Sequence, residues 1–449
     1  MHKILRRVIW SVTITIFLGW HLFGNAQEPT SEMTPIQRQQ TEVMLADMRD
    51  AVKQHYYDSK NHGIDLDARY RTYKDKLSNT GTLGEAFRTV AAYLSGLNDS
   101  HTFFIPPRRS YQAEYGYRMQ IIGDKCYITE TQPETDAAAK LHPGDQVLSL
   151  DGFSLNRDDL WQLEYYLDVL APKPSSAFIV RGPSGEVRKE QVLTKYAERK
   201  HIKDLTTQGG LIDNYKLDFE DEKIRHSLDS RYVEQGDVMI WKMPVFALSD
   251  SHIDHLVDIA RKHRALILDL RDDPGGYVET LDHMVGSFFD HDVNICTRVT
   301  RKDQKLQVAR SRGKRAFAGD LVVLVDSRSA SAAEVFARVI QLQHRGAVLG
   351  DHTSGSVMEA VHFPFSTGID IKIFYGASIT TADVIMADGK SLEKVGVTPD
   401  VIVLPSGEQL AQRQDPVLSR AAASVGLKLD PPSAGKLFPY EWVPLSNAY

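Results

Sequence analysis

Two short runs of almost unbroken apolar residues constrain the fold of this 449-residue chain more than any other feature. They are residues 265–270 and 321–325, and each ends in a polar turn that leads into a segment with apolar residues at helical spacing. Strands without a polar side are covered on both faces, which in α/β proteins is done by helices. The region from 236 to about 404 therefore predicts a sheet with helices packed against it.

The remaining segments differ from one another in residue composition and in apolar pattern, so we expect an α/β protein with several domains. Residues 1–26 begin with Lys3, Arg6 and Arg7, continue as a short apolar run and end in small residues, which is the pattern of a secretory signal peptide. An uncleaved N-terminal membrane anchor is the alternative. The expected location is therefore exported, either periplasmic or extracellular. Further along the chain we predict four units, which are a helical segment at 27–104, a β-rich segment at 110–198, the α/β core at 199–404 (opening with a polar linker at 199–235) and a C-terminal extension at 405–449.

Composition excludes several function classes. Hydrophobic residues make up 42% and charged residues 25% of the chain, as in soluble globular proteins. The two cysteines, Cys126 and Cys296, cannot supply a disulfide framework. A net charge of −6 gives no basic footprint for nucleic acid.

The turn after residues 321–325 contains the strongest candidate nucleophile. Ser331 stands where a strand ends and a helix begins, a position that exposes its hydroxyl beside the free N–H groups of the first helical turn. Those groups, the N–H of Ala332 among them, could stabilise an oxyanion. The alternative is that Ser329 or Ser331 only caps the helix.

The turn after residues 265–270 carries two adjacent glycines, Gly275 and Gly276. Glycine lets the backbone approach a ligand and direct an N–H group that a side chain would block. We expect one of the two to supply a second oxyanion donor, while an ordinary tight turn is the alternative.

Five motifs in order along the chain resemble the tail-specific, or C-terminal processing, serine protease family. They are Asp-Leu-Arg-x-x-x-Gly-Gly at 269–276, Ser-Ala-Ser-Ala-x-Glu at 329–334, the segments 345–355 and 388–400, and the segment 111–195, including 137–148, which resembles the family's PDZ domain. The resemblance implies a crotonase-like protease core with an inserted PDZ domain, and Ser331 as the nucleophile.

The chain departs from the commonest family pattern at one position. Thr-x-Gly-Lys supplies the general base in that pattern, but here Ser356 follows Gly355. The dipeptide Ser100-His101 resembles the tricorn-like branch, in which a histidine takes the proton of the nucleophile. The resemblance implies His101 as the base, linked through Ser100 to Glu393 or a neighbouring carboxylate.

Two alternatives remain open. One is an inactive relative that only binds peptides or other ligands. The other is a serine hydrolase that uses a lysine outside the aligned position, Lys390 or Lys394.

The remaining predictions concern ligands. The PDZ-like segment would bind a chain terminus on the loop formed by Tyr115, Gly116, Tyr117 and Arg118. The alternative is a β-rich domain that only gates the active site. His252, His255 and His263 lack the glutamate of a zinc-protease helix, so no metal site is expected. No cofactor motif is present in the sequence, and polypeptides are the expected substrates. The oligomeric state is left open.

Overall fold

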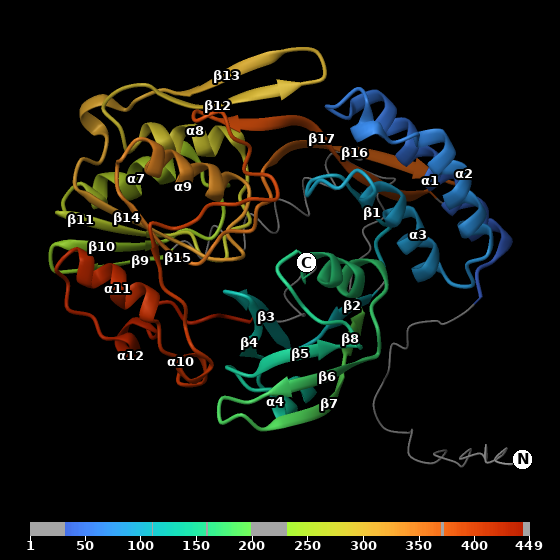
Figure 1. Cartoon of the computed structure of the whole chain (residues 1–449), viewed down its shortest axis with the longest axis horizontal. Helices are drawn as coiled ribbons and strands as arrows, with labels where there is room; N and C mark the ends of the chain where they lie inside the picture. The colour runs from blue at the N-terminus through green and yellow to red at the C-terminus, as the bar shows by residue number, and fades with distance from the viewer. Residues whose placement is uncertain (1–31, 110, 159, 199–230, 370–371, 443–449) are drawn as a thin grey trace, which may run out of the picture.

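A computed structural model describes residues 32–109, 111–158, 160–198, 231–369 and 372–442 (Figure 1). The predicted signal peptide, residues 1–26, lies outside the described residues. None of the helices in the described ranges combines the length and the apolar character that a membrane span requires. The fold is mixed α/β, with helices and several sheets.

A six-stranded sheet forms the centre of the core. Its order is β18-β15-β14-β11-β10-β9, and all neighbours are parallel except the edge strand β9, which runs antiparallel to β10. The strands are β9 (Arg231–Gln235), β10 (Val238–Lys242), β11 (Ala265–Asp269), β14 (Asp320–Val325), β15 (Ala347–Gly350) and β18 (Val401–Ile402). The end of the predicted linker, residues 231–235, is therefore a strand.

Helices cover both faces of this sheet, as the apolar runs predict. Along β10, Met239 and Trp241 face one apolar cluster while Val238 and Ile240 face the other. The first cluster contains the helices α7 (Asp250–Ala260), α8 (Val278–Gly286) and α9 (Ala332–Leu342). The second contains α11 (Pro416–Ser424) and α12 (Pro431–Ala434), which follow α10 (Gly407–Ala411). The C-terminal segment is thus part of the core rather than an appendage.

A second, antiparallel sheet joins the core to the N-terminal helices. Its strands are β1 (Phe103–Ile105), β12 (Val293–Thr300), β13 (Gln304–Ala309), β16 (Met358–Thr367) and β17 (Ile373–Met386). The long strand β17 pairs with β1, β12 and β16. Figure 1 shows β16 and β17 extending from the core to the helices α1 (Pro35–His55), α2 (Leu66–Ser78) and α3 (Leu83–Ser95). Short 3₁₀ turns lie between α1 and α2, at Asn61–Gly63, and between β13 and β14, at Gly313–Arg315.

The helical segment shares its apolar core with this second sheet. Capping boxes at Thr34 and Thr82 fix the starts of α1 and α3, since each threonine side chain and the residue three positions later satisfy free N–H groups reciprocally. Phe104 and Tyr375, both fully buried, belong to the same apolar cluster as the helices. The helices therefore depend on β1 and β17 for their burial.

Residues 111–198 form a β-rich unit with its own apolar core. Five antiparallel strands follow one another in the order β3-β4-β5-β6-β7, and a two-stranded pair, β2 with β8, joins the ends of the unit. The elements are β2 (Tyr111–Glu114), β3 (Tyr117–Ile122), β4 (Lys125–Thr131), α4 (Asp136–Lys140), β5 (Gln146–Leu150), α5 (Leu160–Glu164), a π-helical turn (Tyr165–Leu170), β6 (Ser175–Arg181), β7 (Val187–Leu193) and β8 (Lys195–Glu198). β3 lies at one edge of the five-stranded sheet.

Candidate active site

The two glycine- and serine-rich turns lie side by side because β11 and β14 are parallel neighbours. Hydrogen bonds connect the turns directly. The buried Ser329 Oγ donates to the Leu270 carbonyl at 2.7 Å, and the Ala330 N–H donates to the Asp273 carbonyl at 2.9 Å. The sequence segments around 275 and 331 are thereby held as one unit.

Ser331 begins α9 in a backbone conformation that is unusual for a residue with a side chain. Its φ is +52°, and its N–H donates to the Ser356 carbonyl at 2.9 Å and to Glu334 Oε2 at 3.0 Å. Such strained conformations persist only where the surroundings fix them, and they cluster at functional sites. The strand-to-helix turn thus presents the Ser331 side chain at the N-terminus of α9.

The glycine turn approaches Ser331 so closely that side chains are excluded. A Cβ on Gly275, whose φ is +97°, would lie 2.6 Å from the Cβ of Ser331, and one on Gly276 would lie 2.2 Å from the Phe246 carbonyl oxygen. The Gly275 N–H donates to Asp273 Oδ1 at 2.8 Å. Within the described residues, the N–H groups of Gly276 and Ala332 have no acceptor. Of the three N–H groups predicted to stabilise an oxyanion, these two are therefore free to donate to it.

Sequence reasoning missed the role of Glu334, which holds the loop opposite Ser331. Its fully buried carboxylate accepts hydrogen bonds from the Thr353 hydroxyl at 2.5 Å and from the N–H groups of Gly355, Ser356 and Ser331 at 2.7, 2.9 and 3.0 Å. Burial raises the pKa of Glu334 to about 7, against the effect of these donors. The available signal was a glutamate within the apolar first turns of α9.

A chain of hydrogen bonds connects His101 to Glu393. The Ser100 hydroxyl donates to Glu393 Oε2 at 2.8 Å, and His101 Nδ1 lies 2.7 Å from the same hydroxyl oxygen. Glu393 also accepts from the N–H groups of Ser100 and Val357, at 2.8 and 2.9 Å. The structure thus brings the adjacent residues Ser100 and His101 next to Glu393, which lies 292 positions after His101 in the sequence.

This chain assigns the tautomer of His101. The single proton of the Ser100 hydroxyl is directed to Glu393, so the hydroxyl oxygen accepts from an N–H at Nδ1 and the lone pair of the ring lies on Nε2. Burial lowers the pKa of His101 to about 4. The imidazole is therefore neutral at pH 7, with Nε2 available as a base.

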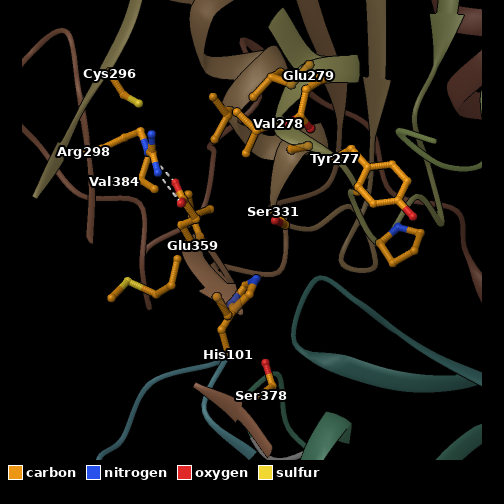
Figure 2. A pocket seen from close by; sticks show the side chains of 18 of the residues that line it. His101, Tyr277, Val278, Glu279, Cys296, Arg298, Ser331, Glu359, Ser378 and Val384 are labelled. Atoms are coloured by element: carbon orange, nitrogen blue, oxygen red, sulfur yellow. Dashed lines mark hydrogen bonds and ion pairs between the residues drawn. The ribbon is translucent and has the colours of Figure 1, made fainter. Parts of the chain in front are cut away.

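Ser331 and His101 line one cavity of about 670 Å³ (Figure 2). Gly276 and Ala332 line it as well, and the remaining walls come from α8, α9 and the antiparallel sheet. No hydrogen bond joins the Ser331 hydroxyl to His101 in this structure. Such contacts are often long before substrate binds, so the shared cavity is the relevant observation.

The lysines considered as alternative bases lie outside this cavity. Lys394 Nζ is 4.0 Å from Glu393 Oε1 and lines a different pocket, between the helices and α5. Lys390 is exposed, next to Asp388. Ser356, at the position of the family's lysine, lies with its hydroxyl 2.8 Å from that of Ser354.

The residues predicted to bind a peptide terminus are engaged within the molecule. The Tyr115 hydroxyl donates to the Leu167 carbonyl at 2.7 Å, the Gly116 carbonyl accepts from the Gln132 N–H at 2.8 Å, and Tyr117 packs edge-on against Phe178. Arg118 forms a two-bond ion pair with Asp272, at 2.7 and 2.8 Å, in the glycine turn of the core.

The edge of β3 also contacts the serine turn. Ser327 Oγ donates to the Ile121 carbonyl at 2.5 Å, and Arg328 Nη2 donates to the Met119 carbonyl at 2.5 Å and to Glu164 of α5 at 2.6 Å. These contacts occupy carbonyl groups to which a peptide would pair if it added to β3 as a strand.

The three histidines considered above as metal ligands, His252, His255 and His263, do not come together in one site. His252 and His255 are exposed on α7, while His263 Nε2 pairs with Glu234 at 2.9 Å. Across the described ranges no three His, Cys, Asp or Glu side chains are grouped as a metal would need.

A serine at a helix N-terminus, two free N–H groups beside it, and a histidine bonded through a hydroxyl to a carboxylate are the groups that a serine hydrolase requires. Residues 237–403 match the model of peptidase family S41.

Curated relatives are named as proteases. The chain is 24% identical over 358 residues to a tail-specific protease of Haemophilus influenzae, covering 75% of this chain and 48% of that protein. It is 22% identical over 411 residues to a carboxyl-terminal-processing protease of Synechocystis, covering 88% of each. The match thus spans about half the length of the first relative and most of the second.

A solved structure has the same fold at low sequence identity. The crystal structure of mature CPAF matches with a TM-score of 0.60 and 14% identity, covering 84% of this chain and 94% of that one. This similarity supports the mixed α/β arrangement of helices and sheets.

Proposed function

We propose that the protein is a serine-type endopeptidase that cleaves polypeptides, with Ser331 as nucleophile and His101 as general base. The observation that carries this proposal is the His101–Ser100–Glu393 chain of hydrogen bonds, which ends at the cavity that Ser331 lines. It supplies a base where the family's lysine is replaced by Ser356.

In the proposed reaction the Ser331 hydroxyl attacks a peptide carbonyl carbon while His101 Nε2 takes its proton. The oxygen that becomes negative accepts hydrogen bonds from the N–H groups of Ala332 and Gly276. His101 then gives the proton to the leaving amine as the C–N bond breaks, which leaves an acyl group on Ser331. Water, losing a proton to His101, hydrolyses that ester and restores the enzyme.

Ser100 and Glu393 are positioning residues in this scheme. The carboxylate fixes the direction of the Ser100 hydroxyl, and that hydroxyl fixes the ring so that Nε2 carries the lone pair. As His101 becomes an imidazolium during the reaction, the nearby carboxylate lowers its energy.

Four further assignments belong to the proposal. Residues 111–198 would act as a PDZ domain that recognises a chain terminus, and 237–403 would form the crotonase-like protease core. Cleavage from or near C-termini is supported by the names of the relatives. Export is supported by the signal-like sequence at 1–26.

Active-site labelling tests the central assignment. Purified protein is treated with a fluorophosphonate, and cleavage of an unfolded protein is followed in parallel for the wild type and for Ser331→Ala, His101→Ala, Lys390→Ala and Lys394→Ala. We expect labelling and cleavage in the wild type and in Lys390→Ala, and neither in Ser331→Ala.

The other outcomes discriminate between the alternatives. Absence of both labelling and cleavage in the wild type would favour a relative that only binds peptides. Full activity in His101→Ala would exclude the histidine as base while keeping Ser331 as nucleophile, and loss of activity in Lys390→Ala or Lys394→Ala would favour a lysine base.

A further inference from the structure

An ion pair forms part of the wall of the cavity beside Ser331 (Figure 2). The guanidinium of Arg298 donates through Nε and Nη2 to the two carboxylate oxygens of Glu359. The side chains are 31% and 21% exposed, so most of the pair is removed from water. The scheme proposed above for Ser331 assigns no role to either residue.

The antiparallel sheet fixes this pair in place. Arg298 on β12 lies opposite Val384 of β17, and Glu359 on β16 lies opposite Ala382 of the same strand. Residues directly opposite each other in antiparallel strands share a face, as do residues two positions apart in one strand. The ion pair therefore crosses above β17, where the small side chain of Ala382 leaves room for it.

The surrounding wall is largely apolar. The apolar side chains that line this part of the cavity are Val278, Leu281, Val335, Met358 and Val384. Arg298 is the one lysine or arginine among the described residues that line the cavity, and Glu359 neutralises it with two hydrogen bonds. Glu279, the other acidic residue of the lining, is exposed, so solvent screens its charge.

A charged substrate side chain that contacts this wall would have no unpaired opposite charge beside it. Burying an ion without a partner costs more than burying a neutral group, because lost hydration is not replaced. A neutral side chain meets apolar surface and an ion pair that is already satisfied.

We propose that Arg298 and Glu359 determine specificity by neutralising each other, so that the cavity accepts an uncharged substrate side chain next to the scissile bond and rejects acidic and basic ones. This inference rests on the proposed peptidase function. It assigns both residues to substrate selection, without a part in the chemical step.

The two single substitutions should then change specificity in opposite directions. Glu359→Gln leaves the positive charge of Arg298 unpaired, so kcat/KM for peptides with Asp or Glu at the cleavage site should rise by about tenfold relative to neutral peptides. Arg298→Met leaves the negative charge of Glu359, so the same gain of about tenfold should appear for Lys or Arg.

A peptide library with each residue type on either side of the scissile bond tests this inference. It is applied to the wild type, the two single variants and the double variant Arg298→Met/Glu359→Gln. In the double variant both charges are removed, so it should retain the wild-type preference for neutral residues and serves as the matched control. Rates are divided by the fraction of molecules that a fluorophosphonate labels, which corrects for misfolded protein.

The outcomes separate this inference from the proposed function. Wild-type cleavage next to charged residues as fast as next to neutral ones would overturn it, and so would single variants with unchanged charge preference. If the single variants do not fold, the inference is tested on the wild type and the double variant. Both must then cleave next to neutral residues faster than next to charged ones. Absence of labelling and cleavage in the wild type would instead contradict the peptidase function itself.

Discussion

The ionisation of one residue, His101, sets the expected pH dependence of activity. Burial lowers its pKa to about 4, and the neutral ring is the active form of a base. Activity should therefore be present at neutral and mildly acidic pH and should fall as the pH drops through about 4, rather than near the ordinary value of about 6.5. The measurement is kcat/KM for a short neutral peptide against pH.

Ser100→Ala provides the control for this pH profile. It breaks the link to Glu393 but leaves the ring buried, so it should lower kcat/KM by about a hundredfold without moving the acidic midpoint far. A wild-type midpoint near 6.5 would contradict the effect of burial on His101.

Glu334 should contribute to stability more than any exposed glutamate. Glu334→Ala leaves the N–H groups of Ser331, Gly355 and Ser356 without their acceptor in a buried site, which should cost about 3–5 kcal/mol of unfolding free energy. Urea unfolding measures the change. Glu279→Ala, at an exposed glutamate of α8, should stay within about 1 kcal/mol of wild type. Equal effects of the two substitutions would contradict the role given to Glu334.

At the residue scale, the sequence indicates functional groups where the signal is local. Ser331 stands at a strand-to-helix turn, and Ser100-His101 is a dipeptide with a recognisable position. The pairing of Arg298 with Glu359 joins residues 61 positions apart on two strands that each pair with a third, so no window of sequence contains it. Glu334 was within reach, because a carboxylate among buried apolar residues needs donors.

At the scale of elements, the turn from β11 to α8 requires glycine for steric reasons. Gly275→Ala places a methyl group 2.6 Å from the Cβ of Ser331 at a φ of +97°, so the two turns must separate. Fluorophosphonate labelling of Ser331 should fall by about a hundredfold or more, because the nucleophile and the oxyanion donors lose their arrangement. Gly313→Ala is a matched control, since it also has a positive φ, +55°, but nothing lies within 4 Å of its Cβ. It should label at the wild-type rate, and loss of labelling in both variants would indicate a general effect on folding.

The edge of β3 gives a second expectation at this scale. If the β-rich unit binds a chain terminus there, the peptide must replace Arg328, which bonds to the Met119 carbonyl and to Glu164. Arg328→Ala in a Ser331→Ala background should then bind a labelled peptide about three- to tenfold more tightly, because Arg328 no longer competes for the Met119 carbonyl. Fluorescence anisotropy with a free C-terminal carboxylate and with the amidated peptide measures this. Equal affinity for the free and the amidated peptide would contradict recognition of a chain terminus, and so would weaker binding in the variant.

Elements differ in how far the sequence reveals them. The buried strands β11 and β14 follow from apolar runs without a polar side. The pairing of β1 with β17 does not, because Phe103–Ile105 is only three residues long and its partner lies more than 270 positions away. The positions of the helices α11 and α12 likewise depend on packing against the sheet face that carries Val238 and Ile240, and no local sequence pattern describes that packing.

At the scale of the whole molecule, the proposed base and the proposed nucleophile come from parts with separate apolar clusters, and strand β17 belongs to both, with Tyr375 in one cluster and Val384 in the other. His101 precedes β1, and Phe104 in that strand is fully buried between the helices α1–α3 and β17. Phe104→Ala should therefore lower the unfolding free energy by about 3–5 kcal/mol, while Leu306→Ala, at a side chain 59% exposed on β13, should change it by less than about 1 kcal/mol.

The same substitution tests whether the helical segment and the active site unfold together. In urea, Ser331 labelling of Phe104→Ala should disappear with the same midpoint as its loss of structure followed by circular dichroism, because the helices cannot separate from β17 without moving His101. Labelling that survives after the helical signal is lost would show that the core holds a reactive serine alone. That result would remove His101 from the mechanism, since the base would already have left the cavity.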